Sequence, residues 1–206
     1  TVSVLLRPGE ADAARGWSPV QPTGYGWLPL LAGVALVGAV TKLAKLDAAL
    51  KWPNALLIDG AKCAGILAET VPDAAGAASA VVLGVGVNVT TRRDELPVNP
   101  NGPPATSLLL AGAAVTDRDP LLRALLRGIA EWYARWRDAG GDVEASGLRD
   151  AYLRHCATLQ RPVRVLLPSG GELTGTATTV DQDGRLVVRT ANGEHRVAAG
   201  DIRHLR

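Results

Sequence analysis

The stretch from Lys51 to Glu69 constrains the fold of this chain more than any other. A Trp-Pro-Asn sequence ends one apolar run, and Asp59-Gly60 is a two-residue turn signal that folds the next run back on itself as a hairpin. Lys62 follows this turn and stands between two apolar runs, shortly before Gly65. A lysine in such surroundings is poorly hydrated, so we expect its ammonium to face an anion. The alternative for an isolated lysine is that its stem lies along apolar surface while its amine reaches water.

Composition limits the classes of protein to which the chain can belong. Its 206 residues are enough for one large and one small domain, and 47% of them are hydrophobic. The net charge is +2 and no run of Lys or Arg forms a stripe, so no nucleic-acid partner is indicated. Cys63, Cys156 and the three histidines fit no metal-binding spacing, and two cysteines suggest reduced thiols in a cytoplasmic protein. The longest apolar run, Trp27 to Val40, is shorter than the roughly 20 residues of a membrane span, so we expect a buried helix and no membrane partner.

Hydrophobic periodicity divides the chain into two parts that meet near Arg161-Pro162. The first part, residues 1–159, mixes strands with helices. The second part, residues 160–206, alternates four or five short strands with glycine-containing turns, which is the pattern of a small barrel. We expect strands over 1–6, 50–52, 56–58, 63–69 and 80–89, helices over 27–46, 119–139 and 148–156, with Asp119 as the N-cap of the middle one, a long loop over 90–107, and barrel strands over 163–167, 172–180, 185–189 and 194–197.

Glycine and asparagine mark further candidate positions. Gly84 and Gly86 alternate along one strand, which leaves room for a flat ligand against its backbone, and Asn88 offers a polar group at the strand end. Alternating glycine is a weak signal by itself. Gly65 is compatible both with close approach of a ligand and with a strand bulge. Asn54 fits a turn residue or a donor to a nucleotide.

Several of these segments together resemble one known family. Residues 51–54 (Lys-Trp-Pro-Asn), followed after the hairpin by residues 62–69 (Lys-Cys-Ala-Gly-Ile-Leu-Ala-Glu), resemble the signature of biotin protein ligases. Residues 84–88 resemble the Gly-x-Gly-x-Asn strand of that family, and residues 105–108 resemble its Ala-Thr-Ser-Leu segment. Residues 161–206 are similar to its small C-terminal barrel. The resemblance covers essentially the whole chain.

The resemblance implies a fold and an activity. The fold would be α+β, with a mixed-sheet catalytic domain of the biotin/lipoate ligase type and a small SH3-like β-barrel. The activity would join biotin to ATP, with Mg²⁺ as part of the substrate complex, giving biotinyl-5′-AMP and pyrophosphate. A lysine of the biotin carboxyl carrier domain of a carboxylase would then take the biotin. Many members of the family form homodimers, so a second copy is a further expected partner.

The resemblance also assigns roles to residues. Lys62 would be the electrostatic catalyst that holds the biotin carboxylate and the phosphate it attacks. Without the resemblance, Trp52, which precedes a proline, would be interpreted as an ordinary core residue, and Arg206 as part of a frayed chain end. The biotin-binding residues implied are Lys62, Gly65, Ile66, Gly84 and Gly86; the ATP-binding residues implied are Trp52, Asn54, Asn88 and Arg206; no metal-ligating residue is implied.

Two departures from the family keep alternatives open. Ala55 stands where the family has an aspartate, which could hold magnesium or orient the lysine. The family's Gly-Arg-Gly-Arg loop is not in this chain, and because Thr1 already begins a strand pattern, we expect further residues before it. A biotin-ligase scaffold that binds without activating its ligand, and a lipoate ligase relative, are therefore alternatives to an active biotin–protein ligase.

Overall fold

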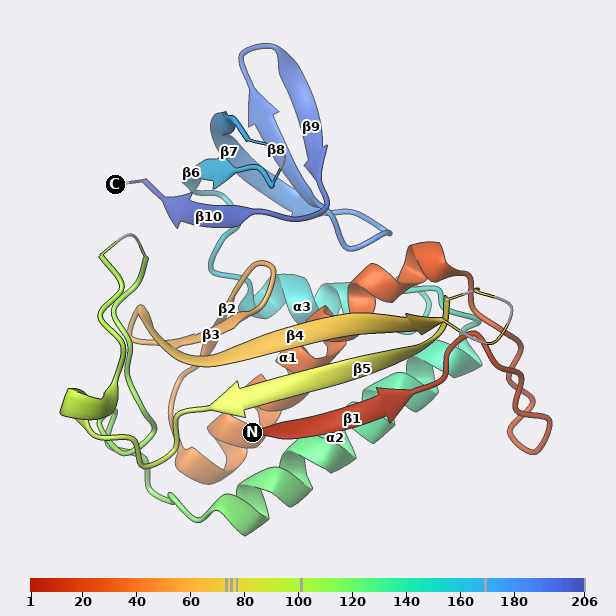
Figure 1. Ribbon diagram of the computed structural model, residues 1–206, viewed down its shortest axis with the longest axis horizontal. Coiled ribbons are helices and arrows are strands. Elements are labelled where there is room, and N and C mark those ends of the chain that lie inside the picture. Colours follow the sequence, from red (N-terminus) through yellow and green to blue (C-terminus); the bar gives the residue numbers. More distant parts are fainter. Residues whose placement is uncertain (73, 75, 77, 101, 169, 206) are drawn as a thin grey trace.

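The first part of the chain folds as one antiparallel sheet with helices on a single face (Figure 1). The computed structural model describes residues 1–206 except 73, 75, 77, 101, 169 and 206. The strand order is β1-β5-β4-β3-β2, and the view in Figure 1 is onto the face that α1 and α2 do not cover. The strands are β1 (Val2–Leu6), β2 (Ala49–Lys51), β3 (Ala55–Ile58), β4 (Ala61–Pro72) and β5 (Ala78–Val87).

The apolar run that begins at Trp27 forms the core of this part. The 3-10 helix η1 (Pro22–Gly26) leads into α1 (Trp27–Ala39), which continues as the π-helix η2 (Val40–Ala44). Together Pro22–Ala44 is 23 residues long and, by length and composition alone, could cross a membrane, so the expectation from sequence that the apolar segment is shorter than a membrane span is wrong. Burial explains the apolar composition instead, because 72% of its apolar 18-residue stretch lies inside the fold.

Two further helices complete the first part. The long helix α2 (Arg118–Asp138) packs against α1, and α3 (Leu148–His155) follows it. The N-cap of α2 is Asp117, whose side chain accepts a hydrogen bond from the Asp119 backbone N–H, so the expected cap at Asp119 is wrong by two residues. The loop over 90–107 contains one short 3-10 helix, η3 (Arg93–Glu95).

The second part is a five-stranded antiparallel sheet of order β10-β6-β7-β8-β9. Buried and exposed side chains alternate along Pro162–Leu166, whereas Leu186, Val187 and Val188 are all buried. The expected turn at Asp183-Gly184 lies between two strands, and Gly193 begins the next strand. The last strand, β10, is the one that sequence left uncertain. The strands are β6 (Pro162–Leu166), β7 (Glu172–Val180), β8 (Leu186–Thr190), β9 (Gly193–Val197) and β10 (Asp201–His204).

The expected α+β class is confirmed, with one difference in detail. We expected a mixed sheet in the first part, whereas every described pair of named strands is antiparallel. The reason is connectivity: β2, β3, β4 and β5 follow one another as hairpins, and hairpins join antiparallel strands. Among the described residues, parallel pairing is confined to two isolated bridges, Leu50 with Cys156 and Lys62 with Ala105.

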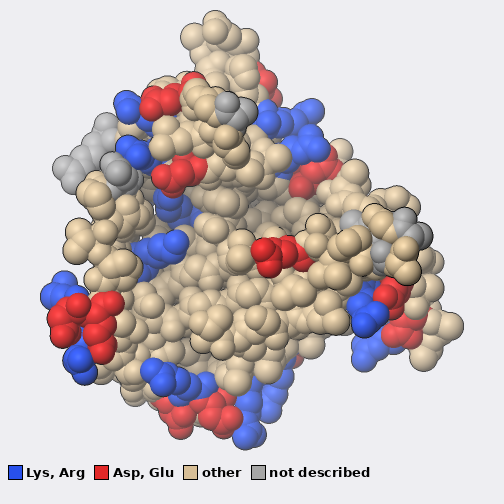
Figure 2. All heavy atoms as spheres, in the orientation of Figure 1, with Lys and Arg blue, Asp and Glu red and all other residues tan. Residues whose placement is uncertain are grey.

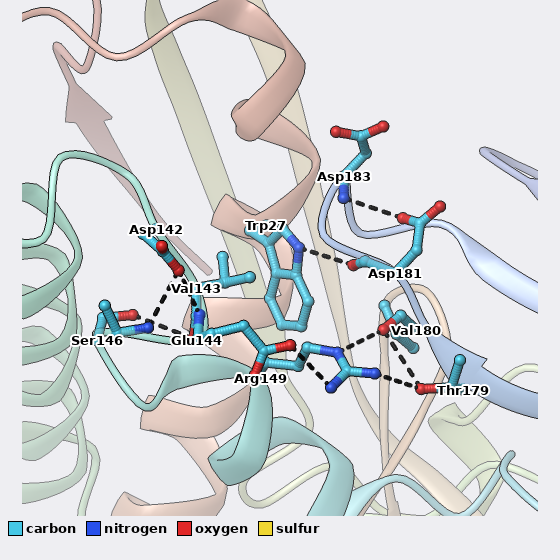
Figure 3. Close-up of polar contacts among 11 residues, drawn as sticks. Trp27, Asp142, Val143, Glu144, Ser146, Arg149, Thr179, Val180, Asp181 and Asp183 are labelled. Carbon is cyan, nitrogen blue, oxygen red and sulfur yellow. Dashed lines mark hydrogen bonds and ion pairs between the residues drawn. The ribbon is translucent and has the colours of Figure 1, made fainter.

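The two parts are held together at the turn between β7 and β8 (Figure 3). The Trp27 indole donates to the Asp181 carbonyl at 3.1 Å. The buried Trp52 indole donates to the Gly184 carbonyl at 3.0 Å. Arg149 of α3 contacts the end of β7, where it donates to the Val180 carbonyl at 2.8 Å and to Thr179 Oγ1 at 2.7 Å. These hydrogen bonds fix the C-terminal sheet against the first part of the chain.

Candidate functional site

Lys62 lies at the start of β4, and its backbone is fixed on both sides. Its N–H donates to the Pro104 carbonyl at 2.7 Å, and its carbonyl accepts from the Thr106 N–H at 2.9 Å. Its side chain folds back over Gly65: a Cβ built on Gly65 would lie 3.7 Å from Lys62 Cε and 3.8 Å from Nζ. The long loop thus orients the lysine, and the missing side chain at Gly65 leaves space for its ammonium.

The three candidate glycines share the uncovered face of the sheet. Gly65 of β4 pairs directly with Gly86 of β5, and Gly84 lies two residues before Gly86 on the same side of the strand. None of the three has a positive φ. A Cβ at Gly84 or Gly86 would meet no protein atom closer than 3.8 Å. Neither backbone conformation nor packing within the protein therefore requires glycine here, which favours close approach of a ligand.

Ala55 and Lys51 extend this face toward the other edge of the sheet. Ala55 of β3 pairs with Gly65 on one side and with Lys51 of β2 on the other, so the three side-chain positions point the same way. Ala55 is 6% exposed. A row of positions therefore runs from Gly86 through Gly65 and Ala55 to Lys51, with the Lys62 ammonium above its centre.

Strand alternation separates two neighbours of Gly65. Ile66 is 3% exposed, and its Cδ1 lies 3.7 Å from a Cβ position on Gly33 of α1, so its side chain belongs to the core on the helix-covered face. Its backbone N–H donates to the Asn54 carbonyl. Leu67, which sequence reasoning did not select, points to the uncovered face opposite Gly84 and is 60% exposed. Of these two neighbours, the side chain that lies on the glycine face is therefore Leu67.

A cavity of about 900 Å³ opens between the two parts of the chain. Figure 2 shows it as a hollow in which Lys and Arg side chains gather below the second sheet. Its wall comes from β2 and the β3–β4 turn, from loop residues 100 and 102–104 and from the C-terminal part, which contributes Arg161, Arg164, Arg203 and His204. Sequence reasoning missed these four residues, because they lie about a hundred residues after the signature.

Electrostatics makes this cavity a site for an anion. Burial lowers the pKa of Lys51 below its ordinary value, Asp201 partly restores it, and Lys62 lowers it further. Burial, followed by Lys51 and Arg161, lowers the pKa of His204 to about 4. Burial is the larger cause of both pKa shifts, and neighbouring cations are the smaller one; a polyanion would relieve the repulsion between these cations. Burial also raises the pKa of the Cys63 thiol to about 12, which leaves it unreactive.

Asn88 ties the glycine strand to the long loop. Its Nδ2 donates to the Thr106 carbonyl at 3.0 Å, its N–H donates to the Cys63 carbonyl, and its own carbonyl accepts from Leu108. Ser107 and Leu108 are fully buried, which agrees with the role of the 105–108 segment as a packing element. The amide oxygen of Asn88 has no hydrogen bond among the described residues.

Two further candidates for ATP binding, Trp52 and Asn54, do not line the cavity. Trp52 is 1% exposed, its N–H donates to Thr158 Oγ1, and its indole is bonded to Gly184, so it belongs to the junction between the two parts. Asn54 lies exposed in the turn after β2. Arg206 lies outside the described residues. A nucleotide role for these three residues stays a prediction.

The residues that the structure describes contain no cluster of carboxylates that would form a resident magnesium site. Among the described residues, no group of three or more His, Cys, Asp or Glu side chains could hold a metal ion. Asp47 and Asp59 line the cavity, and Asp201 is paired with Lys51. A magnesium ion at this wall would therefore depend on ligands from a phosphate group.

The sequence matches two family profiles that together span most of the chain. The profile described as the biotin/lipoate A/B protein ligase family matches residues 23–150, and the one described as the biotin protein ligase C terminal domain matches residues 158–205. The Mycobacterium tuberculosis biotin–[acetyl-CoA-carboxylase] ligase is 40% identical over 191 residues, which cover 91% of this chain and 65% of that relative. The Paracoccus denitrificans enzyme of the same name is 31% identical over 202 residues, which cover 97% of this chain and 78% of the relative.

Other comparisons agree on the fold. The bifunctional ligase/repressor BirA of Bacillus spizizenii is 31% identical, and this chain spans 57% of its length. The apo structure of biotin protein ligase from Aquifex aeolicus superposes with a TM-score of 0.76 at 21% identity, covering 98% of this chain and 81% of that one. The same ligase in complex with biotin and ATP gives a TM-score of 0.69 at 21% identity, covering 99% and 77%.

Proposed function

Because this chain belongs to the biotin/lipoate A/B protein ligase family, we propose that it is a biotin–protein ligase. It would activate biotin with ATP and transfer it to a lysine of the biotin carboxyl carrier domain of a carboxylase. The names of its relatives, biotin–[acetyl-CoA-carboxylase] ligases, support this substrate class. The match of residues 158–205 to the biotin protein ligase C terminal domain favours biotin over lipoate.

The observation that carries the proposal is the position of Lys62. Its ammonium lies over Gly65, at the edge of a glycine face that the protein itself leaves open. A flat ring on Gly84 and Gly86 would direct its carboxylate toward this ammonium. A cation fixed by the backbone bonds of Lys62 is already oriented before the substrate arrives, which is the condition for electrostatic catalysis.

The first chemical step joins two anions. A carboxylate oxygen of biotin attacks the α-phosphorus of ATP, the bond to the bridging oxygen of the β-phosphate breaks, and pyrophosphate leaves. The Lys62 ammonium would reduce the repulsion between the carboxylate and the phosphate and would stabilise the charge that gathers on the phosphate oxygens. Lys62 keeps its proton throughout and forms no covalent bond.

The second step transfers the biotinyl group. The amine of the carrier lysine attacks the carbonyl carbon of the mixed anhydride, AMP leaves with the bonding electron pair, and the amine loses a proton. Exclusion of water protects the anhydride until the carrier arrives. The glycine face is uncovered among the described residues, so its cover must come from other groups, the bound carrier domain included.

The cationic cavity between the two parts is the proposed site of the ATP phosphates. Lys51, Arg161 and Arg203 supply a positive wall, and Mg²⁺ would enter with ATP as part of the substrate, because the phosphates supply ligands that the described residues do not. Two buried free cysteines support a reducing, cytoplasmic location. The unpaired outer edge of β1 in the described sheet supports a homodimer, which sedimentation of the encoded protein would test.

Replacement of the central lysine tests the proposal. In the full encoded protein, Lys62→Ala should lower biotin-dependent pyrophosphate release by about 10²–10³-fold, because one preorganised cation is lost from a water-poor site. Lys42→Ala is the matched control, since Lys42 is an exposed lysine of η2 and lines no part of the interdomain cavity. Near-normal pyrophosphate release by the Lys62 variant, with an unchanged melting temperature, would contradict the assignment.

A further inference from the structure

One ion pair crosses from the first part of the chain to the last strand. Lys51 Nζ of β2 lies 3.9 Å from Asp201 Oδ1 of β10. The Lys51 side chain is 12% exposed, whereas the Asp201 side chain is 58% exposed. At 3.9 Å the two atoms attract each other without a hydrogen bond, and no hydrogen bond from Lys51 Nζ occurs among the described residues. Lys51 is therefore a nearly buried cation whose donors are free.

The same carboxylate also faces a second cation of the cavity wall. Arg203 Nε lies 4.0 Å from Asp201 Oδ2, and this nitrogen is buried with no hydrogen-bond partner. Lys51 and Arg203 both line the interdomain cavity, whereas Asp201 does not line it. One exposed carboxylate thus neutralises two cations that point into the cavity, and it bonds directly to neither.

We propose that Asp201 competes with the phosphates of the nucleotide for Lys51 and Arg203, and so sets the affinity of the site for a polyphosphate. This inference rests on the proposed function, because it concerns the site assigned there to ATP. In the empty site the carboxylate neutralises the two cations. When a polyphosphate enters, its higher charge and its many acceptor oxygens take over Lys51 and Arg203, and Asp201 turns to water.

The geometry makes this exchange easy. Asp201 is mostly solvated, so breaking its ion pair with Lys51 costs little free energy. Lys51 would gain hydrogen bonds to the phosphate oxygens that Asp201 does not supply. Asp201 is also the carboxylate that offsets the crowding of Lys51 by Lys62. Asp201 is therefore a positioning residue that acts through Lys51 and Arg203 and does not touch the substrate.

Calorimetry with inorganic tripolyphosphate and with MgATP tests this competition in the full encoded protein. Asp201→Asn should tighten binding of both probes by about three- to tenfold, because it frees both cations at little change in shape. Asp201→Glu should weaken binding, since the longer side chain closes the gap to Lys51. Glu194→Gln is the control: it removes the same charge from the C-terminal part, at an exposed pair with Arg189 away from the cavity, and should change neither affinity.

A second set of variants separates competition from a merely structural role. In a Lys51→Met background, most of the gain produced by Asp201→Asn should vanish. In steady-state assays Asp201→Asn should lower the KM for ATP and leave kcat and biotin affinity unchanged. Unchanged or weaker tripolyphosphate binding by Asp201→Asn would overturn the inference. Failure of the proposed function would instead appear as absence of biotin-dependent pyrophosphate release in the unsubstituted protein, while the tripolyphosphate measurement would still report on Asp201.

Discussion

Ala55 is an uncharged residue at a position where the neighbouring lysines would favour a carboxylate. It lies between Lys51 and Gly65 on the uncovered face, next to the glycine over which the Lys62 side chain folds. A methyl group there leaves the two lysines without a carboxylate between them. The site as it stands is therefore more positive than one with an acidic side chain at this position, and Asp201 offsets part of this charge at Lys51.

Restoring a carboxylate at this position should raise activity. Ala55→Asp would place an oxygen ligand beside the phosphates of MgATP and should raise turnover by about three- to tenfold, since magnesium prefers one or two protein carboxylates in addition to phosphate. Ala55→Asn is the control of equal size without charge. Pyrophosphate release at several Mg²⁺ concentrations measures the effect. An unchanged magnesium dependence and turnover in Ala55→Asp would make Ala55 a neutral variation.

At this scale, the sequence predicts which residues come together better than it predicts the direction of each side chain. Lys62 and the three glycines lie on one face because their motif is local and their spacing is regular, and their roles in binding stay predictions. The side chain of Ile66 points to the opposite face, because successive residues of a strand alternate. Leu67 could have been found by the same alternation, since it lies two positions after Gly65.

The glycine face of β4 and β5 is the element on which ligand binding would depend. Because a Cβ on Gly84 would meet only Leu67 at 3.9 Å or more, alanine fits the protein itself at this position. Gly84→Ala should leave the melting temperature nearly unchanged and weaken biotin binding by about tenfold or more, because the added methyl group takes the space of the ligand.

A glycine in α1 provides the control for this prediction. Gly38 has no heavy atom within 4 Å of its Cβ position and lies on the helix-covered side of the sheet, so Gly38→Ala should not affect biotin. Calorimetric titration with biotin and thermal melting give both quantities. Equal biotin affinity in Gly84→Ala and the unsubstituted protein would mean that the ligand does not lie on this face.

Strand β10 contributes a group whose protonation opposes folding in acid. The pKa of His204 is lowered to about 4 from its ordinary value of 6.5, first by burial and then by Lys51 and Arg161. Between these two values the unfolded chain binds more protons at this position than the folded one, so stability falls as pH is lowered from about 6.5 to about 4. His204→Gln should reduce this loss. Urea unfolding at pH 7 and pH 4.5 measures it, and an equal loss in both proteins would contradict the shift.

Secondary elements followed from the sequence where their signals are local. The hairpin at Asp59-Gly60 forms with both residues at positive φ, and β7 has the bounds that its alternation predicts. The N-cap of α2 was misplaced because two aspartates near the helix start satisfy the same rule, and only the backbone path selects Asp117. The wall of the cavity could not be predicted, because it depends on how two distant parts of the chain pack together.

At the scale of the whole molecule, Arg149 is a charged side chain of the first part that donates hydrogen bonds to the second part (Figure 3). Its guanidinium bonds to Val180 and Thr179 of β7 and pairs with Glu144 at 3.0 Å. Arg149→Ala should lower the free energy of unfolding by about 2–3 kcal/mol, because it removes two hydrogen bonds from a charged donor and leaves their partners unmatched.

A surface arginine shows what part of that loss is specific to the junction. Arg123 of α2 pairs only with the exposed Asp119, four residues earlier, so Arg123→Ala should change stability by less than about 0.5 kcal/mol. Chemical denaturation of both variants gives the difference. A similar small change in the two would show that the C-terminal sheet is held by its apolar contacts and by the two indoles alone.

Those two indoles have an optical consequence. The chain has five tryptophans, and two of them, Trp27 and Trp52, donate to carbonyls of the β7–β8 turn from positions that solvent does not reach. Separation of the two sheets would expose both rings to water and shift their emission to longer wavelengths, before the rings at Trp132 and Trp136 on α2 report any loss of the helical layer. The protein therefore carries its own fluorescent reporter of the junction beside the cavity, readable without a label.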